Sequence, residues 1–151
     1  VIEIGEKQAV FKVDSTMIYS KLIDGNYPNY KQVIPASFAK KISVPCSDFI
    51  DALEIVSIPL FDASSSYVKI TFTTNKLMFE ANSNIGEGKE HIAIEYEGEE
   101  MSLSFNPQFL SDPFKHIGVD NVNIKINDAF SPIAIESSDG FLYVIMPMRN
   151  K

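Results

Sequence analysis

The sequence predicts an α+β fold in which two helices cover one face of an antiparallel sheet. Two observations support this prediction. The order strand-helix-strand-strand-strand occurs twice, at residues 41–97 and 101–146, which indicates an internal structural repeat. Apolar residues also recur at helical spacing in one segment of each repeat and alternate with polar residues in the strands, so the sheet should have one core face and one more polar face.

The composition describes an ordinary globular chain with an acidic balance. Hydrophobic residues make up 45% of the 151 residues, and 20 acidic residues against 13 basic ones give a net charge of -7. An acidic chain is not expected to bind nucleic acid tightly through phosphate neutralisation alone, so any role on DNA must be topological, local or mediated by other proteins. The single Cys46 excludes an internal disulfide and fits a reducing cytosol. We expect a packed thiol there, although a helix N-terminus can lower a thiol pKa.

Residues 1–23 are predicted as three short strands, with turns at Gly5-Glu6 and Asp14-Ser15. Three strands are too few for a complete domain, so we expect them to be the last strands of a preceding domain. The chain starts without Met inside a strand pattern, and we therefore expect a fragment whose upstream part is missing. Glycine, proline and asparagine then mark residues 24–35 as an interdomain linker, which leads into a domain at residues 36–151.

The first repeat begins with a strand at residues 41–45. Ser47 is predicted as the N-cap of a helix that runs to about residue 58, because Phe49, Leu53 and Val56 (with Ile50) form one apolar stripe and Pro59 follows. A loop is expected at residues 64–66. Strands are then predicted at residues 67–73, 76–81 and 90–97, separated by turns at residues 74–75 and 86–88.

The second repeat begins with a strand at residues 101–105. Asn106 is predicted to cap a helix with Pro107 at its first position, and this helix should carry Phe109, Leu110 and Phe114 inward. Pro113 predicts a kink, or a helix shortened to Asp112. Strands follow at residues 121–126, 132–136 and 141–146, with turns at residue 128 and at residues 138–140. The last strand is apolar on both faces, which favours a central strand that Pro147 ends.

No residue pattern points to catalysis, a metal or a cofactor. His91 and His116 lack metal-ligand spacing, and no phosphate-binding loop is present. A hydrolase site on Asp48, Asp51 and His116 is conceivable, but a solvated helix face with Asp48, Asp51 and Glu54 is the expected explanation. The acidic residues at positions 87–100 indicate either a solvated sheet edge or a surface that complements a basic partner.

Apolar and aromatic residues gather at loops and strand ends instead of in element interiors. This placement favours a groove for a short apolar peptide. The alternative is a generic β-rich interaction domain with no DNA role, in which these residues would be buried. The set comprises Tyr27, Pro28, Tyr30, Val33, Phe130, Pro132, Pro147 and Met148.

Two long motifs resemble one known family. The segment SKLIDGNYPNY at residues 20–30, with VIP at residues 33–35, closely resembles the segment that enters the last domain of bacterial DNA polymerase III beta subunits, the sliding clamps. The ending YVIMPMR at residues 143–149 resembles the C-terminus of that family. Phe105-Asn106 and Ala52-Leu53-Glu54 also occur where helices of the family would place them.

The resemblance implies the DNA-clamp fold, in which each domain is a doubled strand-helix-three-strand unit. The chain would then be a complete third domain preceded by the last strands of the second. Intact members are homodimeric rings around duplex DNA, have no catalytic activity, and bind DNA polymerase III subunits, the clamp loader and repair polymerases through short Gln/Leu/Phe-type peptides. The fragment alone is expected to be monomeric, and its location cytoplasmic.

The resemblance also implies two sets of site residues. The peptide pocket of the family corresponds here to Pro28, Gln32, Val33, Asn106, Phe109, Phe130, Pro132, Val144, Ile145, Met146, Pro147, Met148 and Arg149. Gln32, Phe109 and Pro132 depart from the usual residues at their positions, which affects fine peptide preference. The dimer interface corresponds to Ile58, Pro59, Leu60, Glu87 and Glu90, with Pro59 at a usually aliphatic position. Lys40, Lys41 and Lys115 are the nearby cations for DNA.

Overall fold

The structure is a computed structural model that describes residues 1–60 and 67–149. The chain divides into two compact units, Val1–Tyr30 and Lys31–Lys151. The boundary falls inside the segment that the sequence predicts as a linker. That the first unit belongs to a preceding domain stays a prediction. The expected loop at residues 64–66 lies outside the described residues.

The first unit is a three-stranded antiparallel sheet. Its strands are β1 (Ile2–Ile4), β2 (Gln8–Val13) and β3 (Thr16–Lys21), in the order β1-β2-β3. The three predicted strands and the two turns between them are confirmed. Most of its large apolar side chains are exposed, including Ile4 and Tyr19, so within this unit they have no core to enter.

In its described residues, the second unit contains two α-helices and two four-stranded antiparallel sheets. The helices are α1 (Cys46–Ser57) and α2 (Pro107–His116), and short 3-10 turns lie at η1 (Tyr30–Gln32) and η2 (Ile58–Leu60). The strands are β4 (Lys40–Pro45), β5 (Val68–Thr73), β6 (Lys76–Ser83), β7 (Gly86–Ala93), β8 (Met101–Phe105), β9 (Asn121–Ile126), β10 (Ile133–Glu136) and β11 (Leu142–Ile145). The α+β class and the doubled strand-helix-three-strand order are thereby confirmed.

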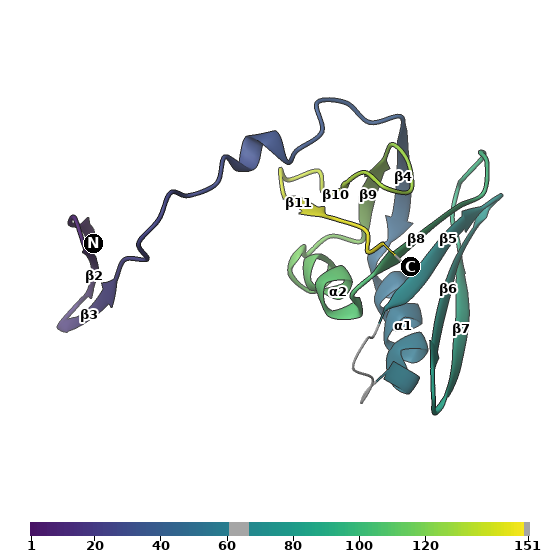
Figure 1. Cartoon of the computed structure of the whole chain (residues 1–151), viewed down its shortest axis with the longest axis horizontal. Coiled ribbons are helices and arrows are strands. Elements are labelled where there is room, and N and C mark those ends of the chain that lie inside the picture. The colour runs from purple at the N-terminus through teal and green to yellow at the C-terminus, as the bar shows by residue number, and fades with distance from the viewer. Residues whose placement is uncertain (61–66, 150–151) are drawn as a thin grey trace. The chain divides into compact units, whose positions relative to one another are not determined.

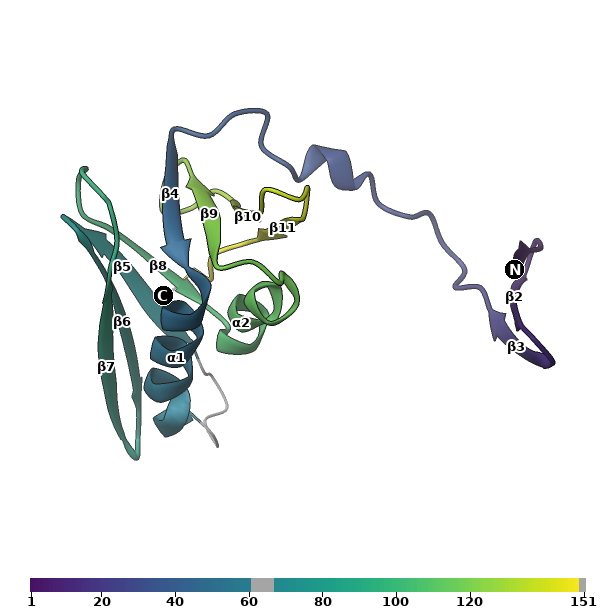
Figure 2. The ribbon, with the colours of Figure 1, turned by 180° about the vertical axis from the view of Figure 1, so that it is seen from behind.

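The two repeats exchange their first strands. β4 precedes α1 but pairs with β9, and β8 precedes α2 but pairs with β5. The resulting sheet orders are β11-β10-β9-β4 and β7-β6-β5-β8. Figure 1 and Figure 2 show α1 and α2 next to each other, with β5, β6 and β7 beside α1. The sequence did not predict this exchange, which locks the repeats into one core.

The core of the second unit is built around Phe49. Its ring stacks on Phe114 of α2 with centroids 3.9 Å apart and meets Phe79 of β6 edge-on at 5.0 Å. Phe49 and Phe79 are fully buried and Phe114 is nearly so. Aromatic pairs of this kind contribute about 0.5–1.5 kcal/mol beyond the area that they bury. The contacts join both helices and one sheet.

Helix α1 begins one residue earlier than predicted, and Ser47 is not its cap. The cap position is Pro45, whose φ of -66° and ψ of 127° lead directly into the helix. The Cys46 N–H donates to the Asp120 carbonyl at 2.8 Å, so a strand-end carbonyl replaces the side-chain cap. Burial, and secondarily the Asp120 carboxylate, raises the pKa of the Cys46 thiol, as expected for a packed cysteine.

The predicted turn at residues 86–88 is wrong. These residues belong to β7, and the turn lies at Asn84-Ile85. The strand has a glycine at position 88 because α1 passes close to it: a Cβ built on Gly88 would lie 2.6 Å from the Val56 carbonyl oxygen. The strand predicted at residues 90–97 consequently ends at Ala93.

Helix α2 also differs from its prediction. Asn106 caps it as expected, accepting N–H bonds from Gln108 at 2.9 Å and Phe109 at 3.4 Å. The helix does not stop before Pro113 but continues to His116, because buried Leu110 and Phe114 hold it on the core on both sides of that proline. Phe109 does not point inward and is 56% exposed. It precedes buried Leu110 by one residue, and successive residues of a helix are turned about 100° from each other, so the two side chains face different directions.

The last strand is an edge strand, and the prediction of a central strand covered on both faces is wrong. Within residues 1–60 and 67–149, β11 pairs only with β10. Leu142 is 45% exposed and only Ile145 is buried among its four residues.

Among the described residues, the structure has no helix long and apolar enough to cross a membrane.

The close approach at Gly88 gives a first prediction. Replacement by alanine places a methyl group against helix backbone, and we expect Gly88→Ala to lower the free energy of unfolding by about 1–3 kcal/mol. Gly86→Ala is the matched control in the same strand, because the nearest atom to its Cβ is 4.0 Å away. Urea denaturation followed by circular dichroism measures both. Equal midpoints for the two variants would contradict the close contact.

Candidate functional site

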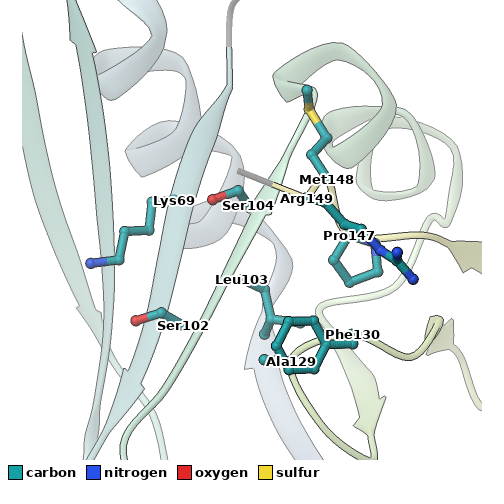
Figure 3. A pocket seen from close by; sticks show the side chains of 9 residues that line it. All are labelled: Lys69, Ser102, Leu103, Ser104, Ala129, Phe130, Pro147, Met148 and Arg149. Atoms are coloured by element: carbon teal, nitrogen blue, oxygen red, sulfur yellow. The ribbon is translucent and has the colours of Figure 1, made fainter. Parts of the chain in front are cut away.

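A hollow of about 540 Å³ lies beside the C-terminal tail of the second unit. The tail leaves its sheet after Ile145, where β11 ends, and the Met148 N–H donates to the Ser104 carbonyl of β8 at 2.7 Å. This bond docks the tail on the edge of the other sheet. Figure 3 shows the walls: Lys69 of β5, residues 102–104 of β8, the turn residues Ala129 and Phe130, and tail residues 147–149.

Phe130 is held in place by the turn that Asp128 organises. Asp128 Oδ1 accepts the N–H groups of Phe130 and Ser131, each at 2.8 Å, and Oδ2 accepts the Ser131 hydroxyl at 2.8 Å. These bonds, with the one from Phe130 first, hold the pKa of Asp128 below its ordinary value. The Phe130 ring is 73% exposed, so the turn presents an aromatic surface to solvent.

The floor of the hollow combines hydroxyl groups with an ion-paired lysine. The hydroxyls of Ser102 and Thr71 hydrogen-bond to each other at 2.9 Å across β8 and β5. The Lys69 ammonium lies 3.5 Å from the Glu80 carboxylate, which also attracts Lys89 at 3.9 Å. Chemically the hollow therefore offers apolar contacts from the tail and the turn and polar contacts from the strands.

Four of the residues predicted for the peptide pocket line this hollow: Phe130, Pro147, Met148 and Arg149. The remaining ones lie elsewhere. Val144 and Ile145 are in β11, followed by exposed Met146, while Pro132 precedes β10 and is half-buried. Asn106 caps α2 and Phe109 is exposed on it. Gln32 and Val33 lie at and after η1, and Pro28 is an exposed residue of the first unit. Their binding role stays a prediction.

Five lining residues were missed by the sequence analysis: Lys69, Ser102, Leu103, Ser104 and Ala129. The strands that carry them were predicted, but their alignment was not. Lys69 lies opposite Ser104 only because β5 pairs with β8, a partner from the other repeat. A sequence signal for that pairing does not exist in either strand alone.

A second hollow of about 500 Å³ lies where α1 ends against β7. The predicted interface residues Ile58, Pro59 and Glu87 line it, together with Ile55, Ile85 and Lys89. Ile58 and Ile85 are each 70% exposed, so the surface is apolar at its centre. The other two predicted residues differ in position, since Leu60 is buried in the core and Glu90 is half-buried on β7.

Comparison with known proteins gives one consistent answer. Residues 31–149 match the family described as DNA polymerase III beta subunit, C-terminal domain. The beta sliding clamp of Chlamydia pneumoniae is 33% identical over 149 residues, which covers 98% of this chain and 40% of that protein. The beta sliding clamp of Escherichia coli is 30% identical over 151 residues, which covers 98% of this chain and 41% of that protein.

Solved structures agree with the sequence relatives. The sliding clamp of Bartonella birtlesii bound to griselimycin has a TM-score of 0.90 and 30% identity, covering 99% of this chain and 41% of that one. The beta sliding clamp of C. crescentus was solved with PEG bound to a putative beta-motif tethering region. It has a TM-score of 0.90 and 25% identity, covering 99% of this chain and 40% of that one. The chain thus spans about 40% of the length of the relatives that it matches.

The Asp128 turn gives a second prediction, on pH. Because the pKa of Asp128 in the folded chain is below its ordinary value of 3.8, the turn is stabilised above that pH and loses this contribution as pH falls through the folded value. NMR shifts of the Phe130 and Ser131 amides should therefore titrate with a midpoint below 3.8. Asp128→Asn is the control and should abolish this titration. A midpoint at or above the ordinary value would contradict the proposed hydrogen bonding.

Proposed function

Because the chain belongs to the DNA polymerase III beta subunit family, we propose that it is the C-terminal part of a sliding clamp, a processivity factor of DNA replication. The observation that most directly supports this proposal is the match of residues 31–149 to the C-terminal domain of that family. The generic β-rich domain without a DNA role is not favoured, since the relatives named above are all sliding clamps.

In this proposal the hollow beside the tail is part of the docking site for partner peptides. Phe130, Pro147 and Met148 supply apolar surface, and β8 supplies a rigid floor. The partners are DNA polymerase III subunits, the clamp loader and repair polymerases, which carry short Gln/Leu/Phe-type peptides. Support comes from exposed apolar side chains around a hollow, an arrangement typical of peptide-recognition grooves. The domain binds and positions its partners and catalyses no reaction.

Duplex DNA is held by topology in this proposal and not by strong contacts of this domain. The exposed face of α1 carries Asp48, Asp51 and Glu54, and the chain as a whole has a charge of -7. Attraction to phosphate from such a face is weak. A ring that encloses its substrate needs little affinity for it, so an acidic domain is compatible with the role. The site of action is the cytoplasm, where a reduced Cys46 is expected.

Peptide docking gives a third prediction. A fluorescein-labelled Gln/Leu/Phe-type pentapeptide should bind the chain saturably in a fluorescence polarisation titration. Phe130→Ala and Met148→Ala should each weaken binding about five- to thirtyfold, the usual range for loss of an apolar anchor. Leu142→Ala is the matched control, because Leu142 is a 45% exposed apolar residue outside the hollow. Absence of saturable binding, or equal losses in all three variants, would refute the docking role.

The second hollow gives a fourth prediction. We propose that Ile58, Pro59 and their neighbours form one half of the ring interface, and that the other half belongs to a different domain. The chain alone should then be a monomer, with a mass near 16.9 kDa in light scattering. A mass about twice that value, restored to the monomer by Ile58→Glu, would show instead that this surface pairs with itself.

A further inference from the structure

Strand β4 ends its sheet, and alternate backbone groups of this strand point away from the sheet. The Cys46 N–H donates to the Asp120 carbonyl, and these two residues continue the register of β4 with β9. Because hydrogen-bonded and non-hydrogen-bonded pairs alternate in an antiparallel ladder, Pro45, Ser43 and Lys41 occupy the non-bonded positions. The N–H groups of Ser43 and Lys41, and the carbonyls of all three residues, therefore lie on the free edge of β4.

The internal repeat shows what an edge at this position can hold. β8 has the place of β4 in the second repeat, and Ser104 corresponds to Ser43, since each stands two residues before the cap position of the following helix. The Ser104 carbonyl accepts the Met148 N–H at 2.7 Å, so the segment that follows β11 is docked on the edge of β8. The fold can thus add a further segment of chain at this position of the repeat.

The corresponding segment of the first repeat takes a different path. Residues 94–96 follow β7 as the tail follows β11, but they hydrogen-bond to the turn between β5 and β6. The Ile94 N–H donates to the Asn75 carbonyl at 3.3 Å, and the Asn75 N–H donates to the Tyr96 carbonyl at 3.0 Å. The Tyr96 hydroxyl also accepts from the Lys40 ammonium at 2.8 Å. The segment is thereby held at its own turn, and among the described residues β4 pairs with no strand except β9.

A hollow of about 600 Å³ lies beside this edge and determines which side chains would fit there. Pro45 and Ile94 give it apolar surface, and Asn75 and Asn121 add amide groups. Glu95 is exposed and is the one charged residue of its lining. Alternate side chains of a strand added to β4 would point to the side on which the hollow lies.

The surroundings of the hollow are acidic. Residues 97–100 follow Glu95 and contain three further exposed glutamates. The cations Lys41 and Lys76 lie on the neighbouring strands β4 and β6, but both are exposed and neither lines the hollow. A cationic side chain is therefore the complement of this hollow, with apolar side chains beside it.

We propose that the free edge of β4 binds an extended segment of a partner protein by strand addition, and that this segment carries Lys or Arg beside β-branched residues. Its backbone pairs with Ser43 and Lys41, and a cationic side chain meets Glu95 in the hollow. The net charge of -7 attracts such a segment at long range. This hollow shares no lining residue with the hollow of the tail, so the inference goes beyond the docking function proposed there.

The test uses the whole chain labelled with nitrogen-15 and the peptide acetyl-Lys-Val-Lys-Val-Lys-amide, whose valines favour a strand. At about 90% saturation the Ser43 and Lys41 amides should exchange with solvent about five- to tenfold more slowly, a limit set by the fraction of free chain. The Ile42 and Val44 amides face β9 and should keep their exchange rates, which makes them internal controls.

N-methylated peptides test the backbone pairing. One peptide is methylated on the nitrogens of its lysines and the other on those of its valines. Only alternate N–H groups of an added strand face β4, so one of the two peptides should lose at least about tenfold in affinity while the other keeps most of its binding. Equal affinities of the two peptides would overturn strand addition.

Variants of the chain assign the site. Ser43→Pro removes an N–H of the free edge and leaves the ladder with β9 intact, so it should weaken binding at least about tenfold, with thermal denaturation as the check of folding. Glu95→Gln should weaken binding about two- to fivefold, the range of an exposed ion pair. Glu6→Gln is the matched control, because Glu6 is exposed in the first unit and it removes the same charge.

Each remaining outcome also decides the proposal. Absence of saturable binding, or binding that leaves the exchange of Ser43 and Lys41 unchanged, overturns it and leaves the docking function of the tail hollow intact. Equal losses in Glu95→Gln and Glu6→Gln overturn the role of the hollow, since they would reflect the charge of the whole chain. Slower exchange of the two edge amides at high chain concentration without peptide would identify a second copy of the chain as the occupant and overturn the proposed partner.

Discussion

The exchange of first strands between the two repeats is the constraint on which the rest of the second unit depends. β4 closes the sheet of β9 to β11, and β8 closes the sheet of β5 to β7. Each helix follows a strand that belongs to the opposite sheet, so neither repeat can form its core without the other. The stack of Phe49 on Phe114 joins the two helices that follow the exchanged strands. The exchange also puts the edge of β8 where the tail after β11 can reach it, and the Met148–Ser104 bond and the hollow follow from that position.

The internal repeat places a related hollow at the other edge. This hollow has a volume of about 600 Å³ and lies beside β4. Its lining includes Ser43 from the first strand of the repeat, Asn75 from the first turn, and Glu95 from the segment after the last strand. Ser104, Ala129 and Pro147 have corresponding places around the hollow of the tail. The hollow beside β4 has two amides and a carboxylate besides its apolar residues, whereas the hollow of the tail has cations besides its apolar residues and hydroxyls. The fold thus provides two equivalent positions, which differ in the side chains that line them.

Local chemistry allowed much of this fold to be predicted from the sequence, and non-local contacts explain the failures. Asn106 and Pro107 favour a helix start, because Asn is a good cap and Pro fits the first helical position, and the turn at Asp128 follows from its short side chain. Gly86 and Gly88 suggested a turn because the sequence does not reveal the helix that passes over Gly88. In the site, Phe130, Pro147 and Met148 were predicted from apolar residues at loops and strand ends, and Arg149 through family resemblance. Lys69 was not, because its place depends on the register between β5 and β8.

The walls of the hollow differ in how firmly they are held, and this difference bears on recognition. The floor is β8, whose Leu103 is buried and whose pairing with β5 fixes its position. The Phe130 wall is fixed by three hydrogen bonds to one carboxylate. The tail is attached by a four-residue edge strand and by the Met148 bond, and it presents exposed Met146 and Met148. Methionine side chains adapt their shape at little cost. In the proposed docking role, a firm floor with one adaptable wall suits peptides that share anchors but differ in sequence.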